Sequence, residues 1–436
     1  MHVETAGREK PNESATYPPL NLSHRHGLWS DRGMRSIRSA TAPLILSLLV
    51  GFCHEVSALD LKALLKNGGT RVEREDGTPL IQYRDAEHFV PASILKVATT
   101  FCALEALGSD FRFTTTFYQG PGPTLYIKGS GDPSLVSEEL NSVAQRLAIL
   151  MPRINRIVID PSLFSPDIDI DGSSASLNPY DSKVAAFVGN FSSAALTRRK
   201  DGTIVSAEPQ TPLTPLSRQA GMKLNRGASE RINLGHSWQV GTQYGGELLA
   251  EFLKRAGASG ALDVTTGKIP SDATKIYDHK SSKDLAEISQ GLLKYSTNFT
   301  ANQLFLTLGI HKYGAPATVE KGQLAMTECL KQKVGWRDFH IEEGSGLSRR
   351  NQVTPIQMTK LLQSFEPYKD LLNVEDDFTA KTGSLRGVNT LAGYFDLSAT
   401  ERVRFAILVN SDVEHTHKYK VARALRDYLL RNQGTR

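Results

Sequence analysis

The sequence predicts an α+β protein built from more than one domain. Three observations support this: an early β-hairpin signal, short β-type runs punctuated by Gly and Pro between residues 112 and 275, and helices from residue 282 that lead into two C-terminal strands. The chain has 436 residues and a formal net charge of +5. This charge is mild for the length, and no basic run is interleaved with aromatic residues, so we expect no nucleic-acid partner.

The first 58 residues are predicted to lie outside the fold. A polar stretch is followed, after Met34, by Arg35 and Arg38, the apolar segment TAPLILSLLVGF and the small residues VSA, which end at Ala58. A positive region, a short apolar segment and small residues, in that order, predict a secretory signal cleaved near Ala58. We therefore expect an exported protein of the periplasm or another extracytoplasmic part of the cell envelope.

Two alternatives to a cleaved signal stay open. A lipid anchor at Cys53 is disfavoured because Phe52 is bulky where a small residue is expected, and an uncleaved membrane anchor is the other possibility. The true start, Met1 or Met34, also stays open. Two cysteines remain after cleavage, Cys102 and Cys329. Export permits a disulfide between them, but isolated cysteines on apolar helices are expected to be free and buried.

The N-terminal elements have clear local signals. Residues 59–66 form a short amphipathic helix, and Asp76-Gly77 turns a hairpin between the strands TRVERE and TPLIQYR. A strongly apolar helix starts at VPASILKVATTF and ends near Gly108. The region that follows, 113–275, is predicted to be an inserted domain with strands RFTTTFYQ, PTLYIKG and INRIVIDPSLF and helices SEELNSVAQRLAILM and GGELLAEFLKRAG.

Residues 59–112 and 276–436 are predicted to form one discontinuous domain around this insert. Its second part has helices at 282–294, 299–309 and 317–332, then strands NTLAGYFDLS and VRFAILVNSD and a basic amphipathic helix over 418–431. We expect that helix to pack on the sheet, with at most peripheral membrane contact. No Cys/His cluster has metal-ligand spacing, so we expect no metal and no cofactor.

Ser93 and Lys96 lie three residues apart at the start of the apolar helix, which places both side chains on one face. A serine hydroxyl needs a base to become a nucleophile, and a lysine can be that base if burial or a neighbouring cation lowers its pKa. The alternative is a capping serine beside a lysine that extends to solvent. On this pair alone, the alternative is the better interpretation.

Two further segments reverse that judgement. KYSTNFTANQLF contains Ser296 and Asn298, whose spacing of two suits a turn between helices rather than one helical face. Asn298 could instead cap the next helix. AKTGSLRGVNTLAGYF contains Lys381-Thr382-Gly383 leading into a strand, where the glycine permits close backbone approach and the lysine and hydroxyl suit a carboxylate.

S-x-x-K, S-x-N and K-T-G in this order are the motifs of penicillin-binding proteins and class A β-lactamases. The chain resembles the penicillin-binding serine D-Ala-D-Ala carboxypeptidases, and within them the class C low-molecular-mass group of the penicillin-binding protein 4 type, peptidase family S13. The long stretch between Ser93 and Ser296, the segments KGSGDPSL and IDPSLF, and GSGLSRRNQVTP carry the closer match. Two positions depart from the family pattern: Glu343, where Asp is expected, and Asn302, where Glu is expected.

The resemblance implies a penicillin-binding fold, an antiparallel sheet flanked by helices with a smaller inserted α/β domain, and acyl transfer to water. Ser93 is implied as the nucleophile and Lys96 as the general base. Ser296, assisted by Lys381, passes a proton to the leaving nitrogen, and Asn298 positions Lys96 and the substrate amide. The resemblance assigns the terminal carboxylate to Thr382 and Ser384 and the oxyanion to the N–H groups of Ser93 and Ser384, with Gly383 between them.

Peptidoglycan stem peptides are the implied substrates, and β-lactams the implied covalent inhibitors. For the third residue of the stem, the resemblance points to Asp160 and Phe164 of IDPSLF and to Arg349 of GSGLSRR; strand alternation adds Arg386, two residues after Ser384. The alternative is that Asp160 caps a turn and both arginines are solvated. Other functions stay open: DD-endopeptidase activity on cross-links, a β-lactamase, or a catalytically silent wall-binding protein. The oligomeric state is left open.

Overall fold

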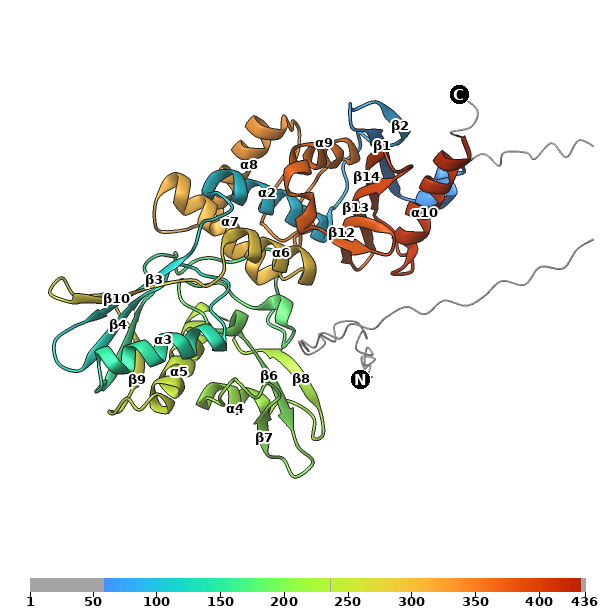
Figure 1. Cartoon of the computed structure of the whole chain (residues 1–436). Coiled ribbons are helices and arrows are strands. Elements are labelled where there is room, and N and C mark those ends of the chain that lie inside the picture. The colour runs from blue at the N-terminus through green and yellow to red at the C-terminus, as the bar shows by residue number, and fades with distance from the viewer. Residues whose placement is uncertain (1–58, 236, 433–436) are drawn as a thin grey trace, which may run out of the picture. The chain divides into compact units, whose positions relative to one another are not determined.

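A computed structural model of the chain describes residues 59–235 and 237–432, so the predicted signal segment lies outside the described residues. Strands in this part of the chain form three sheets, shown with their flanking helices in Figure 1. No helix among the described residues is long and apolar enough to cross a membrane.

The largest sheet has six strands, and every neighbouring pair is antiparallel. It joins the two ends of the chain, because β1 lies between the C-terminal β14 and its own hairpin partner β2. A short helix, α1 (Leu61–Leu65), precedes β1, as predicted. In spatial order the strands are β11 (Asn373–Glu375), β12 (Phe378–Leu385), β13 (Val388–Asp396), β14 (Arg402–Val409), β1 (Gly68–Arg74) and β2 (Pro79–Tyr83).

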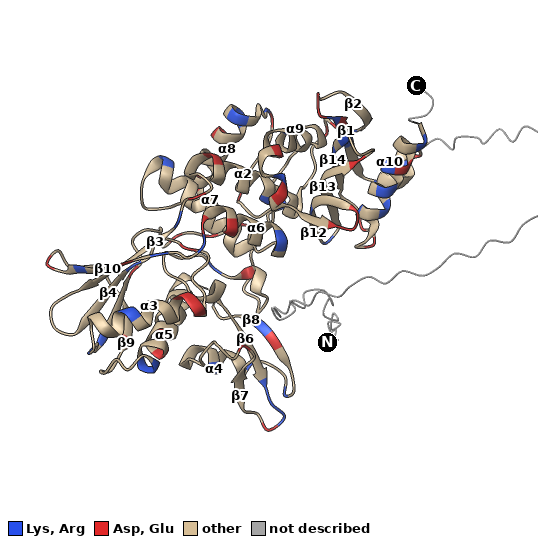
Figure 2. Cartoon of the chain, viewed as in Figure 1, with Lys and Arg blue, Asp and Glu red and all other residues tan. Residues whose placement is uncertain are grey.

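Side chains of β14 alternate between two buried faces, as the strand period of two requires. Phe405 and Ile407 pack with residues of α10 (His417–Asn432), whereas Ala406 and Leu408 pack with α9 (Pro355–Phe365) and α2 (Lys96–Leu107). The sheet is thus flanked by helices on both faces, which confirms the predicted fold class. Figure 2 shows the Lys and Arg residues that run along α10, and its apolar face packs on the sheet as expected.

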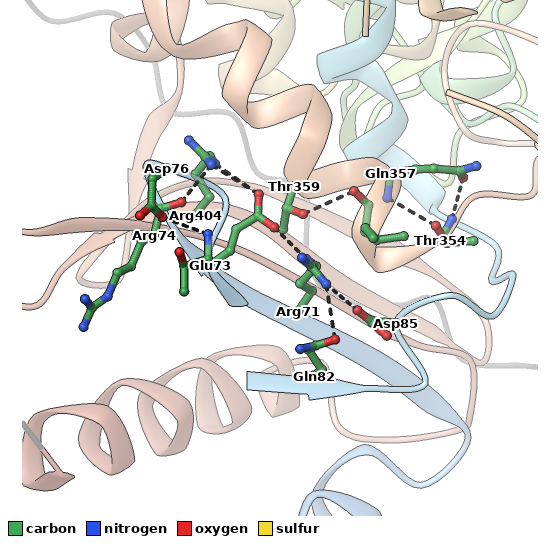
Figure 3. Close-up of polar contacts among 12 residues, drawn as sticks. Arg71, Glu73, Arg74, Asp76, Gln82, Asp85, Thr354, Gln357, Thr359 and Arg404 are labelled. Carbon is green, nitrogen blue, oxygen red and sulfur yellow. Dashed lines mark hydrogen bonds and ion pairs between the residues drawn. The ribbon is translucent and has the colours of Figure 1, made fainter. Parts of the chain in front are cut away.

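A buried ion network stabilises the sheet on its α9 side, away from any sequence motif (Figure 3). The Arg71 guanidinium donates to Glu73 (Nε–Oε2 2.5 Å) and to Asp85 (Nη1–Oδ2 2.7 Å). Arg404 donates to the other Glu73 oxygen at 3.3 Å. Each buried guanidinium therefore has a carboxylate partner, which is the usual condition for burying charge.

A helical layer covers the sheet and carries a disulfide. It contains α2, α6 (Leu285–Tyr295), α7 (Asn298–Tyr313) and α8 (Val319–Cys329), and a π-helical turn, Leu330–Val334, extends α8. Cys102 of α2 and Cys329 of α8 are joined, with Cα atoms 5.9 Å apart. The expectation of two free cysteines was therefore wrong. Residues that share no local sequence signal can meet when two helices pack side by side.

The insert has a mixed sheet whose strands run in the order β10-β3-β4-β5-β9. β4 pairs with β5 and β5 with β9 in parallel, and the other two pairs are antiparallel. Helices α3 (Ser137–Leu150) and α5 (Trp238–Arg255) share its apolar core. The strands are β3 (Thr114–Gln119), β4 (Thr124–Lys128), β5 (Arg156–Asp160), β9 (Asp263–Thr266) and β10 (Thr274–Lys280).

A third, three-stranded sheet lies within the same insert. It consists of β6 (Ser193–Arg198), β7 (Ile204–Ser206) and β8 (Ser229–Asn233), with α4 (Pro215–Gly221) beside it. The predicted second boundary of the insert, at 275/276, falls inside β10. Because β10 pairs with β3 at the opposite end of the insert, its strand pairing favours a boundary after Lys280.

Candidate active site

Ser93 and Lys96 lie where the chain enters α2. Ser93 is half-buried in a 3₁₀ turn, Ala92–Leu95, and Lys96 is the fully buried first residue of the α-helix. The Lys96 amine lies 2.8 Å from Ser93 Oγ, 2.9 Å from Asn298 Oδ1 and 2.7 Å from the carbonyl oxygen of Ser345. The alternative interpretation, a capping serine beside a lysine that extends to solvent, does not fit this pair, because the Lys96 amine is directed inward.

The Asn298 side chain links Lys96 to the insert. Its Nδ2 donates to the carbonyl oxygen of Tyr180 at 3.2 Å, and its Oδ1 accepts from Lys96. The carbonyl can only accept, so it fixes the amide with the nitrogen toward Tyr180 and the oxygen toward Lys96. The helix-capping alternative for Asn298 is not what the structure has: Thr297 occupies the cap position of α7.

The pKa of Lys96 is held well below its usual range. Burial is the main cause, because a charged amine loses its hydration, and the nearby positive charge of Lys381 lowers the pKa further. The Glu343 carboxylate acts in the opposite direction. A buried lysine next to a second cation has the electrostatic environment that favours a neutral amine.

Ser296 ends α6 in a left-handed conformation, with φ 56° and ψ 35°. Such a backbone is uncommon for a residue with a side chain and often marks a functional position. Thr297 alone separates it from Asn298, so both side chains come from the connecting turn between α6 and α7, as predicted. Within residues 59–235 and 237–432, the Ser296 hydroxyl forms no hydrogen bond, whereas its backbone N–H donates to Leu292.

Lys381, Thr382 and Gly383 lie within β12 itself rather than in a turn before a strand. Lys381 is 2% exposed, donates to the Thr382 carbonyl oxygen at 2.9 Å, and has a pKa lowered to about 8, mainly by burial. A Cβ at Gly383 would lie 2.2 Å from Thr390 Oγ1 and 2.9 Å from the Ser93 backbone nitrogen. The glycine therefore lets β12 lie directly against Ser93.

The structure gives the surroundings of the four residues that were predicted to contact the third residue of the stem. Asp160 is 9% exposed and accepts from the Ser162 backbone N–H at 2.9 Å, so the turn-capping alternative describes it. Phe164 is buried in the helical core. Arg386 lies in the tight turn between β12 and β13, so strand alternation does not place it on the face of Ser384. Arg349 is exposed and donates to the Arg386 carbonyl oxygen.

The sequence reasoning missed a third buried lysine. Lys418, in the first turn of α10, is 0% exposed and lies behind β12, where its amine is 2.7 Å from Ser384 Oγ. A signal was present: Lys418 precedes the buried Val421, Ala422 and Leu425 by three, four and seven residues, so it shares their apolar face.

Glu343, which departs from the expected Asp, is fully buried beside the site. One carboxylate oxygen accepts from the backbone N–H and hydroxyl of Ser345, at 2.7 and 2.5 Å. The other accepts from the Ser348 N–H at 3.2 Å and from Asn351 Nδ2 at 2.9 Å. Four donors thus hold the loop whose Ser345 carbonyl contacts Lys96. The second departure, Asn302, serves the same loop by accepting from the Gly344 N–H at 2.9 Å.

Known proteins resemble this chain in sequence and in fold. A D-alanyl-D-alanine carboxypeptidase of Actinomadura sp. (strain R39) is 26% identical over 410 residues, covering 75% of this chain and 74% of that protein. Penicillin-binding protein 4 of Haemophilus influenzae superposes with a TM-score of 0.69 at 23% identity, covering 86% of this chain and 99% of that one. The same protein complexed with a β-lactam gives 0.64 at 21% identity, covering 85% and 98%.

A predatory endopeptidase of Bdellovibrio bacteriovorus shares the fold more distantly, with a TM-score of 0.50 at 17% identity and coverage of 84% and 93%. A family model described as the D-Ala-D-Ala carboxypeptidase 3 (S13) family matches residues 56–228, 226–379 and 371–432. This match spans almost all of the described chain and confirms the resemblance found in the motifs. The chain belongs to the D-Ala-D-Ala carboxypeptidase 3 (S13) family.

Proposed function

We propose that this chain is a serine-type D-Ala-D-Ala carboxypeptidase that forms an acyl-enzyme at Ser93. One observation carries the proposal: the Ser93 hydroxyl lies 2.8 Å from the amine of Lys96, a buried lysine whose pKa is strongly lowered. A hydroxyl beside a neutral amine can lose its proton as it attacks, which is the condition for a serine nucleophile.

The contacts of Lys96 also favour the direction of that proton transfer. The Ser345 carbonyl oxygen and Asn298 Oδ1 can only accept, so they take two N–H groups of the amine. A neutral amine has two N–H groups and one lone pair. The lone pair is then left to face Ser93, where it can accept the hydroxyl proton as Ser93 Oγ bonds to the substrate carbonyl carbon.

The outer edge of β12 offers a place for the substrate. β11 pairs with β12 only as far as Ala380, and no other described strand pairs with that edge over residues 381–385. An extended peptide can add to a free strand edge through main-chain hydrogen bonds. This would place a terminal carboxylate near Thr382 and Ser384, beside the positive charge of Lys381, and the scissile carbonyl near the N–H groups of Ser93 and Ser384.

The remaining steps use the groups between α6 and α7. The Ser296 hydroxyl would relay to the leaving nitrogen the proton that Lys96 took from Ser93, so the C–N bond breaks, free D-Ala departs and an ester to Ser93 remains. Water then hydrolyses the ester and regenerates the serine. Removing one oxyanion donor in such a reaction typically costs about 2.7–4 kcal/mol in the chemical step.

Three other activities remain to be separated by experiment. DD-endopeptidase cleavage of cross-links uses the same groups, and we propose it as a second activity of this site. A β-lactamase is disfavoured because the buried carboxylate beside the site, Glu343, is already occupied by four donors. A silent wall-binding role is disfavoured because the nucleophile, base and second serine are all retained.

The proposed partners are peptidoglycan stem peptides and, as covalent inhibitors, β-lactams. The Haemophilus influenzae relative has been solved with a β-lactam, which supports the second part of this proposal. Such substrates lie outside the cytoplasm, so we also propose export after cleavage near Ala58.

Trapping with a labelled penicillin tests the proposal. The label should map to the peptide that contains Ser93 and should be lost in Ser93→Ala, while the exposed Ser109→Ala variant keeps it. Wild-type protein should also release D-Ala from a stem peptide ending in D-Ala-D-Ala. An adduct on another peptide, or one that persists in Ser93→Ala, would refute the assignment.

A further inference from the structure

Lys418 is held against the back of the candidate substrate strand by Asn389, at the start of β13. Asn389 Oδ1 accepts from the Lys418 backbone N–H at 2.9 Å, and Asn389 Nδ2 donates to the His415 carbonyl oxygen at 3.0 Å. These bonds fix the start of α10 on the sheet. The Lys418 amine then donates to Ser384 Oγ at 2.7 Å and to the Gly383 carbonyl oxygen at 3.3 Å.

This contact decides which way the Ser384 hydroxyl can donate. An ammonium has three donors and no acceptor, so Ser384 Oγ must accept from Lys418. The single hydroxyl proton of Ser384 cannot point back at the ammonium. Because Ser384 is itself exposed, that proton can be donated to a group that arrives from outside.

Lys418 also lacks the carboxylate partner that the buried arginines of the sheet have. Arg71 and Arg404 are paired with Glu73 in the sheet (Figure 3). By contrast, the hydrogen bonds of Lys96, Lys381 and Lys418 within the described residues all go to uncharged groups.

The groups around Lys418 leave this positive charge in place. Glu375 is the carboxylate that acts on it, but one oxygen of Glu375 accepts from the Tyr419 hydroxyl at 3.0 Å. Lys381 and His415 face the same region; burial lowers the pKa of both side chains, and the charge of Lys418 lowers it further. An ammonium with no ion-pair partner favours an anion that arrives from outside.

We propose that Lys418 is a positioning residue that makes the site select substrates ending in a carboxylate. It turns the Ser384 hydroxyl into an outward donor and adds positive charge behind β12, without touching the substrate itself. This inference rests on the proposed function, since it assigns the substrate carboxylate to the edge of β12.

The experiment compares Lys418→Met with Lys420→Met, the same change two residues away on an exposed side chain of α10. Each variant is acylated with a labelled penicillin and, separately, with its methyl ester, which has the same ring but no carboxylate. Lys418→Met should acylate about 10- to 100-fold more slowly with the acid, the scale of one charged hydrogen bond. The rate with the ester should stay within about twofold of wild type, a change of under half a kcal/mol.

A double-mutant cycle with Ser384→Ala shows whether Lys418 acts through that hydroxyl. In the Ser384→Ala background, Lys418→Met should cause only a small further loss. Lys418→Gln keeps an N–H donor, so it should acylate with the acid faster than Lys418→Met does. If thermal unfolding shows that Lys418→Met is misfolded, Lys418→Gln takes its place in the comparison.

The outcomes separate the two proposals. If wild type is labelled at Ser93, the proposed function stands, and any of three results would refute the role of Lys418. Lys418→Met could acylate with the acid at the wild-type rate, or its rates with the acid and with the ester could fall by the same factor. The third is that Lys418→Met slows acylation by the acid as much in the Ser384→Ala background as it does when Ser384 is present. If wild type is not labelled by penicillin at all, the proposed function fails, and this inference fails with it.

Discussion

The α-carbon of Gly346 lies so close to the backbone of Ala92 that a Cβ there would be 1.9 Å from the Ala92 carbonyl oxygen. Gly346 also has φ 80°, a conformation that disfavours other residues. This contact joins the loop that holds Lys96 to the turn that carries Ser93. The position of the nucleophile therefore depends on a glycine well outside the three motifs.

Gly346→Ala should displace Ser93 and slow acylation by penicillin by at least about tenfold, the equivalent of roughly 1.4 kcal/mol. Gly335→Ala is the matched control, because Gly335 has a similar φ of 74° but nothing within 4 Å of its Cβ position. Both variants carry the same backbone penalty, so thermal unfolding should change similarly. Equal acylation rates in the two variants would contradict the role of this contact.

The rate of acylation should depend on pH with two limbs. It should rise as Lys96 loses its proton, at a pH well below 10.5, and fall as Lys381 loses its proton near pH 8, since that charge attracts the carboxylate. In Lys381→Met the residual rate should rise at a higher pH, because the cation that lowers the Lys96 pKa is gone. Stopped-flow acylation from pH 5 to 10 measures this, and a flat profile would exclude Lys96 as the base.

Lys418→Met should make the fold more stable at neutral pH by roughly 1–2 kcal/mol, after two lost hydrogen bonds are allowed for. Burial lowers the pKa of Lys418 from 10.5 to about 8, so the charged amine costs stability below pH 8. As pH rises from 8 to 10.5 the folded protein holds fewer protons than the unfolded chain, and that cost disappears. Denaturant unfolding at pH 7 and 10 should show the advantage shrinking; a constant difference would argue against a buried charge.

Arg349→Ala should lower kcat/KM for a diaminopimelate stem peptide by roughly 1.5–3 kcal/mol, the value of a charged hydrogen bond. Its guanidinium is exposed and held by the Arg386 carbonyl oxygen, so it is available to a substrate carboxylate. Arg386→Ala keeps that carbonyl and should cost less. Penicillin, which has no such arm, is the reference substrate; equal losses on both substrates would mean that Arg349 supports the fold.

The disulfide predicts a redox-dependent stability. Thiol titration of the folded protein should find Cys102 and Cys329 unreactive until the disulfide is reduced. Reduction should lower the free energy of unfolding by roughly 2–4 kcal/mol. A variant with serine at both positions should match the reduced protein and be insensitive to reductant. Free thiols at both positions in protein purified without reductant would contradict the pairing.

Local signals were enough to predict much of this fold. The hairpin at Asp76-Gly77, the end of α2 at Gly108 and the apolar face of α10 were each predicted from residues close in sequence. β10 was missed because its sequence, TKIYDHK, has neither an apolar run nor alternation: it is an edge strand that pairs with β3, far back in the chain.

The site shows the same limit. The motif pairs set the expectation that Ser93, Lys96 and Asn298 meet, and the structure brings these three together. Arg386 was misplaced because strand alternation was extended one residue too far, past Leu385 into a turn. Lys418 was overlooked because a lysine on an apolar helix face is informative only when the strand behind it is known.

Cys102 and Cys329 are separated by 227 positions in the sequence. The insert and the turn between α6 and α7 lie between them. A protease that cuts any exposed loop of the insert therefore leaves one covalent molecule. The piece with Ser93 and Lys96 stays tied to the piece with Ser296, Asn298 and Lys381. Nicked protein would thus keep these groups tied together, and the cut would be visible only on a reducing gel.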